Sequence, residues 1–160
     1  MLDVLKTELA TGFTAVPPAV AAIRLMAAVL LGACVGLERE LSGKAAGLRT
    51  HILVSLAACL FILVSQALVT LDFGTDDSVR IDPLRLVEAV TTGVAFLGAG
   101  IIFRSDGRVR NVTTGTSVWL AGAIGLACGS GQIWLAAMAA VLVVAVIVIL
   151  GWLENGAQGD

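Results

Sequence analysis

The sequence has little charge: only 14% of its 160 residues are Asp, Glu, Lys or Arg, whereas 58% are hydrophobic. A soluble domain of this size covers its core with more charged side chains than that. The mean hydropathy is +0.99, and the apolar residues come in long blocks instead of short alternations. The scarcity of charge therefore excludes an ordinary soluble domain and indicates a membrane protein.

Groups that carry catalysis or hold metals are also scarce. The sequence has no tyrosine and a single histidine, His51, and it contains neither a GxSxG nor an HExxH motif. Residues 43–50 hold glycines, a lysine and a threonine, but not in the Walker order that a nucleotide-binding loop needs. Cys34, Cys59 and Cys128 share no ligand spacing with His51 and are typical of small packing residues. We therefore expect no enzymatic activity, no catalytic residue, no cofactor and no metal site.

Long apolar blocks are what the sequence has in abundance. A membrane-spanning helix needs about 20 apolar residues, and five blocks approach or reach that length, at residues 19–37, 48–71, 86–103, 112–128 and 133–153. The sequence therefore predicts an all-α, polytopic membrane protein with about five transmembrane helices in a domain spanning residues 19–153. Residues 154–160 would form a short cytoplasmic tail.

The segment before the first span is expected to lie on the membrane surface. Within residues 1–18, Leu2, Leu5, Leu9 and Phe13 share one face of a helix, which is typical of an amphipathic surface segment. The Pro-Pro pair at residues 17 and 18 would end that helix before the first span begins.

The basic residues predict the orientation of the chain. Lys and Arg favour the cytoplasmic side of a membrane, and they occur mainly in two short turns. One turn carries Arg39, Lys44 and Arg49, the other carries Arg104, Arg108 and Arg110, and the acidic loop between spans two and three has two arginines. The N-terminus is therefore predicted outside and the C-terminus inside, although the tail itself has no Lys or Arg. Turns this short do not indicate a nucleic-acid partner.

Glycines recur along the first four spans. Small residues let helix backbones approach closely in lipid, so we expect helix packing at Gly32, Gly36, Gly93, Gly98 and Gly100. The pair Gly98 and Gly100 has an alternative interpretation, a broken helix that lines a binding site, as in transporters. A parallel repeat of spans one and two by spans three and four is a second open possibility.

One candidate polar group lies at the outer end of the third span. Asp82 is followed by Pro83, which predicts a helix start with Asp82 as its cap. Glu88 lies just inside the apolar block and needs a partner there, either Arg85 one turn away or Arg24 of the first span. The group is either an ion pair that joins spans one and three or the outer mouth of an ion or proton path.

A second candidate group lies at the two basic turns. Glu38 and Glu40 could pair with Arg49, Arg104 or Arg110 of the facing turns, or these charges could simply anchor helix ends at the interface. A paired cluster would lock two hairpins together or bind an anionic group. The complete candidate polar set is Arg24, Glu38, Arg39, Glu40, Lys44, Arg49, Thr50, His51, Asp82, Arg85, Glu88, Arg104, Arg110, Thr113 and Thr114.

Three strings together carry a resemblance to a known family. They are LLGACVGLERELSGKAAGLRTHILVSLAA at residues 30–58, DPLRLVEAVTTGVAFLGAGIIFR at 82–104 and VRNVTTGTSVWLAGAIGLACG at 109–129. The combination resembles the MgtC/SapB family of bacterial membrane proteins. The resemblance covers the polar set above except Arg24 and Glu88, and it also covers Gly98, Gly100 and Trp119. It does not assign a role to any of these positions.

The resemblance implies a multi-pass protein of the bacterial inner membrane, linked to growth under magnesium limitation and, in pathogens, to survival inside host phagocytes. It implies a non-enzymatic regulator of membrane machinery or membrane energetics, with the lipid bilayer, other inner-membrane proteins and a possible homo-oligomer as partners. An ion transporter or channel for Mg²⁺ or H⁺ is the alternative. Longer members continue into a soluble cytoplasmic domain resembling an ACT module, so a chain ending at Asp160 is expected to be a short form without it.

Overall fold

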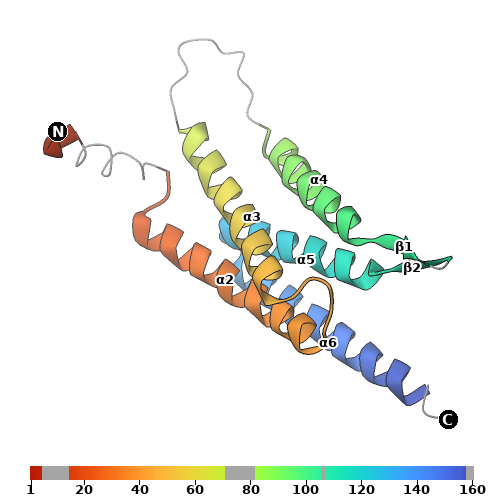
Figure 1. Ribbon diagram of the computed structural model, residues 1–160. Helices are drawn as coiled ribbons and strands as arrows, with labels where there is room; N and C mark the ends of the chain where they lie inside the picture. Colours follow the sequence, from red (N-terminus) through yellow and green to blue (C-terminus); the bar gives the residue numbers. More distant parts are fainter. Residues whose placement is uncertain (5–14, 71–81, 106, 158–160) are drawn as a thin grey trace.

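The computed structural model describes residues 1–4, 15–70, 82–105 and 107–157 of the chain (Figure 1). Its helices are α2 (Pro18–Leu41), α3 (Leu48–Val69), α4 (Pro83–Ile101), α5 (Val112–Gly129) and α6 (Ile133–Ala157), and a two-stranded hairpin joins α4 to α5. Within these ranges, five helices are long and apolar enough to cross a membrane. The prediction of a helical protein with about five spans is confirmed. The surface helix expected before the first span lies mostly outside the described residues.

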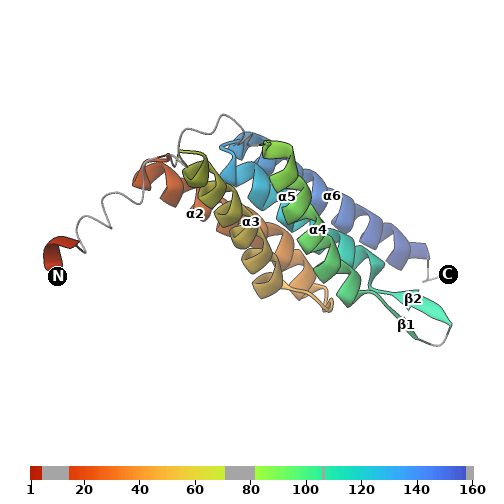
Figure 2. The same cartoon turned by 90° about the horizontal axis from the view of Figure 1, so that it is seen from above.

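Helix α5 is the centre of the bundle. It packs against α2, α3, α4 and α6, whereas α4 makes its main contacts with α5 alone. Both views show α3 and α5 lying between α2 and α4 (Figure 1, Figure 2). Of the 18-residue spanning window, 56% is buried in α5 and 11% in α6. The central helix therefore contacts protein on most of its sides, and the outer helices present apolar faces outward.

Glycines make the central contacts possible. A Cβ at Gly125 would overlap the carbonyl oxygen of Ser55 on α3, and one at Gly129 would lie 2.7 Å from the carbonyl oxygen of Cys59. On the α4 side, Gly98 and Gly115 face each other, so that a Cβ on Gly115 would lie 2.7 Å from the Gly98 oxygen. Helices α3 and α4 thus both pack onto α5 through backbone surfaces that no side chain separates.

Gly93 and Gly100, which the sequence predicts to pack against another span, make no such contact. Nothing in the described chain lies within 4 Å of a Cβ placed on Gly93 or Gly100. In this they depart from the prediction that all five glycines pack one span on another. The alternative of a helix broken near Gly98 does not occur either, since α4 is continuous from Pro83 to Ile101. Its start is as predicted, with Asp82 as N-cap accepting the Leu84 N–H at 3.0 Å.

Both basic turns differ from the sequence prediction. The first apolar block was expected to end at residue 37, but α2 continues through residues 38–40 to Leu41. The second turn is a β-hairpin of β1 (Phe103–Ser105) and β2 (Arg108–Arg110), in which Phe103 pairs with Arg110. Gly107, at φ +76°, allows the tight reversal between the strands. The two turns lie at the same end of the bundle, which we call the basic-loop end (Figure 1).

Candidate functional site: a buried polar centre at the basic-loop end

The polar centre begins in the last turns of α2. One face of α2 remains buried past the end of the apolar block. This buried stripe includes Val35, Gly36 and, one turn after Val35, Arg39. The Arg39 side chain is only 3% exposed. The helix extends beyond the hydrophobic residues because this stripe still packs on α3 and α5. A charged side chain is therefore placed inside the bundle near its end.

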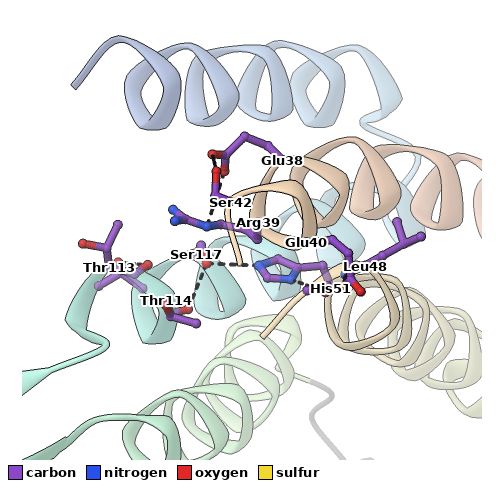
Figure 3. A network of polar contacts seen from close by, with 11 residues as sticks. Glu38, Arg39, Glu40, Ser42, Leu48, His51, Thr113, Thr114 and Ser117 are labelled. Atoms are coloured by element: carbon purple, nitrogen blue, oxygen red, sulfur yellow. Dashed lines mark hydrogen bonds and ion pairs between the residues drawn. The ribbon is translucent and has the colours of Figure 1, made fainter. Parts of the chain in front are cut away.

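His51, in the first turn of α3, is fully buried, with 0% of its surface exposed. Its Nδ1 lies 2.8 Å from the carbonyl oxygen of Gly47, and its Nε2 lies 3.0 Å from the Ser117 hydroxyl on α5 (Figure 3). Ser117 Oγ is also 2.9 Å from the carbonyl oxygen of Thr114. The imidazole therefore joins α3 to α5 across 66 positions of sequence.

The hydroxyl of Ser117 couples this contact to the charge of His51. Nδ1 must donate to the Gly47 carbonyl, because a carbonyl oxygen only accepts. When the single Ser117 proton points to the Thr114 carbonyl, Nε2 must also donate, and the imidazole is then a cation. When that proton points to Nε2, the imidazole is neutral.

Space for His51 comes from two glycines of α2. A Cβ on Gly36 would lie 2.9 Å from the His51 Cβ, and one on Gly32 would lie 2.9 Å from its carbonyl oxygen. Ser55, one turn further along α3, donates its hydroxyl to the Ala28 carbonyl at 2.9 Å. The α2–α3 contact is therefore close along this part of both helices.

Arg39 and Glu38 form an ion pair beside the histidine. The Arg39 Nε lies 3.3 Å from Glu38 Oε2, and these two atoms are buried without a hydrogen-bond partner among the described residues. The other oxygen of Glu38 accepts the Ser42 hydroxyl at 2.8 Å. Glu40 instead caps α3, since its Oε2 accepts the Leu48 N–H at 2.9 Å. A side chain on Gly47 would collide with that carboxylate.

The structure brings together only part of the candidate set. Glu38, Arg39, His51 and Thr114 converge at the basic-loop end, as Figure 3 shows. The expected pairing of Glu38 and Glu40 with facing arginines is not present, because both carboxylates have the local partners described above. The remaining members at this end are exposed (Lys44, Arg49, Arg104, Arg110 and Thr113) or half-buried (Thr50).

The members at the opposite end do not form one group. Arg24 Nη1 donates to Gln66 Oε1 at 3.0 Å and to the Gly129 carbonyl at 2.8 Å, which ties α2 to α3 and to the last turn of α5. Arg85 and Glu88 are exposed on α4. Of the two partners expected for Glu88, Arg24 is thus engaged elsewhere, and among the described residues no ion pair joins Arg85 to Glu88.

Sequence analysis missed several of these polar residues. Ser117, Ser55 and Gln66 supply the contacts of His51, Ala28 and Arg24. These three side chains lie deeper in the apolar blocks than the hydroxyl residues of the candidate set, which are at the block starts. One signal was available, since Ser117 follows Thr114 by three residues and so lies on the same helical face. In the part of the chain that the structure describes, no three His, Cys, Asp or Glu side chains gather into a possible metal site.

Five apolar helices packed around a glycine-rich centre, with polar contacts at both ends, define a multi-pass helical membrane protein. A family model matches residues 25–156, and the chain belongs to the MgtC family. The resemblance recognised from the sequence is thereby confirmed.

Curated relatives support the same assignment. The chain is 40% identical over 110 residues to "Putative magnesium transporter YhiD" of Escherichia coli K12. The aligned residues cover 69% of this chain and 51% of that protein. It is 39% identical over 134 residues to "Protein MgtC" of Brucella abortus (84% and 52%) and 37% identical over 128 residues to "Protein MgtC" of Salmonella typhimurium (80% and 51%). The chain spans about half the length of these relatives. No solved structure matches it.

Proposed function

We propose that this chain is a non-enzymatic regulator of other membrane machinery in the bacterial inner membrane. It would serve growth under magnesium limitation and, in a pathogen, survival inside host cells. Relatives named MgtC and a relative named as a magnesium transporter support the link to magnesium. The choice of a regulator over a transporter rests on the packing of the bundle.

The observation that carries the proposal is the closed interior between α2, α3 and α5. Ala28, Val35, Cys59 and Cys128 are all 0% exposed there, and α5 lies on α3 at backbone distance through Gly125. An ion that crosses a membrane needs polar groups or water along its whole way. The middle of this bundle instead holds mostly small apolar side chains in contact, and the buried Ser55 hydroxyl there is bonded to the Ala28 carbonyl.

A transporter or channel for Mg²⁺ or H⁺ is the second candidate, and the printed name of the Escherichia coli relative favours it. The polar contacts at the two ends of the bundle could then be the two mouths of a path. The two candidates differ in one measurable property, which is whether the purified protein alone moves ions.

We expect the purified chain in liposomes to leave Mg²⁺ and H⁺ fluxes at the level of protein-free vesicles. Trapped indicators would report both ions, with an ionophore as positive control and protease accessibility of the loops as proof of insertion. The same chain should restore growth at low magnesium to a strain that lacks its MgtC-family gene.

Each outcome decides between the candidates. Silent vesicles together with restored growth support a regulator. A saturable flux would establish a transporter, and its loss in Glu88→Gln would place that exposed carboxylate on the path. Failure to restore growth, with normal expression, would contradict the link to magnesium limitation.

A further inference from the structure

The Arg39 guanidinium is a buried cation that is only partly satisfied within the described part of the chain. The side chain is 3% exposed, and its Nε has no hydrogen-bond acceptor among the described residues, although Glu38 Oε2 lies 3.3 Å away as an ion-pair partner. An arginine carries five N–H donors in a fixed planar fork. A buried charge is costly unless hydrogen bonds accompany its ion pair. The side chain is thus arranged to accept a further, negatively charged partner.

This guanidinium points toward the first turn of α5, where Thr113 and Thr114 lie (Figure 3). The N-cap residue of that helix, Asn111, has φ +63° and makes no side-chain hydrogen bond to the turn, because its amide lies 3.3 Å from the Ile101 carbonyl. The N–H groups of Val112, Thr113 and Thr114 are therefore left without a side-chain cap. Uncapped N–H groups at a helix start attract anions.

The charges around this place favour an anion on balance. The hairpin that leads into α5 carries the exposed Arg104, Arg108 and Arg110. Glu38 opposes an anion, but it lies on the Nε edge of the guanidinium, and its other oxygen accepts the Ser42 hydroxyl. The Nη groups point away from Glu38 and toward α5 in Figure 3.

We propose that Arg39 and the first turn of α5 together bind a phosphoryl group at the basic-loop end of the bundle. Two N–H groups of a guanidinium match two oxygens of a phosphoryl group, and backbone N–H groups of the helix start reach a third. Such a group is carried by phospholipid headgroups at the membrane surface and by phosphate in solution.

An apolar groove beside the site favours the lipid as its source. Thr113 and Ser117 also line a groove of about 240 Å³ between α5 and α6, which continues along Leu142, Val146 and Ile147. A phospholipid bound through its phosphoryl group would have an acyl chain next to this groove. Free phosphate would leave it unused.

The test uses the full chain in detergent, with dioleoylphosphatidylglycerol and inorganic phosphate as separate probes. Native mass spectrometry counts lipid retained by the protein, and titration with phosphate followed by ³¹P line broadening reports the free anion. Two variants remove the site in different ways. Arg39→Gln removes the fork, and Thr113→Asp places a carboxylate among the N–H groups. A carboxylate in the first turn of a helix also stabilises that helix, so we expect Thr113→Asp to unfold no more easily than the parent chain, which circular dichroism checks.

We expect both variants to weaken retention of the lipid, or affinity for phosphate, by at least about tenfold, which is the loss of one charge-assisted hydrogen bond or more. Arg49→Gln is the matched control, since it removes an exposed arginine at the same end and should bind as the unmodified chain does. Binding of the lipid alone supports a lipid site, and binding of phosphate supports a site for the free anion. Binding of neither probe, or equal binding by all three variants, overturns the proposal.

Discussion

Replacing Gly125 by alanine should lower the free energy of unfolding by about 3 kcal/mol or more. The new Cβ would overlap the carbonyl oxygen of Ser55 and lie 2.7 Å from its carbonyl carbon. Backbone atoms cannot rotate away as a side chain could, so α3 would have to move. That movement would also strain the 2.9 Å hydrogen bond from Ser55 to Ala28, which joins α3 to α2. The measurement is thermal unfolding in detergent followed by circular dichroism.

Gly93→Ala is the matched control for this effect. Both glycines lie within spanning helices, but nothing is within 4 Å of a Cβ on Gly93. Alanine favours a helix over glycine by about 1 kcal/mol, so this variant should unfold at the same temperature as the parent chain or higher. Equal destabilisation by the two substitutions would show that the α3–α5 contact is not close.

Replacing Arg24 by alanine is expected to cost about 1.5–3 kcal/mol, the usual effect of losing hydrogen bonds to a charged group. The substitution leaves Gln66 and the Gly129 carbonyl without the donor that now lies 3.0 and 2.8 Å from them. It also removes a cation from the C-terminus of α5, where a positive charge is favourable. Denaturant-induced unfolding of the purified protein measures the loss.

Glu88→Gln distinguishes this arrangement from an Arg24–Glu88 ion pair. Glu88 is exposed on α4, and an exposed carboxylate contributes little to stability, within about 0.5 kcal/mol. We therefore expect Glu88→Gln to unfold like the parent chain. If it destabilised the protein as much as Arg24→Ala does, the alternative of an Arg24–Glu88 ion pair would be correct and the contacts of Arg24 described here would not.

The fold was largely predictable because hydropathy records which segments meet lipid. All five spans and the start of α4 at Asp82–Pro83 follow from apolar blocks and capping residues. The end of α2 was missed because hydropathy falls at Glu38, whereas helical packing continues to Arg39 one turn below Val35. Burial, and not composition, determines where that helix ends.

The site was less predictable, since it depends on which helices are neighbours. The contact of His51 with Ser117 requires α3 to pack on α5, and nothing in the apolar pattern pairs those two spans. The partners of Arg24 were not predictable for the same reason. From the sequence, an acidic partner was expected for its charge, but in the structure it donates to an amide oxygen and a backbone carbonyl. A sequence readily suggests ion pairs between charged residues, but it does not show which neutral amide or carbonyl oxygen will accept a hydrogen bond.

The accessibility of Cys59 and Cys128 tests the closed interior most directly. Both thiols are 0% exposed at the centre of the bundle, and a water-soluble methanethiosulfonate reagent reaches only thiols in contact with water. In a Cys34→Ser background, we expect intact-mass analysis of proteoliposomes to show no adduct, while Ser130→Cys in the exposed α5–α6 turn is modified and denaturation exposes both native thiols. Modification of Cys59 or Cys128 in the folded protein would reveal water inside the bundle and contradict the closed packing on which the proposed regulator rests.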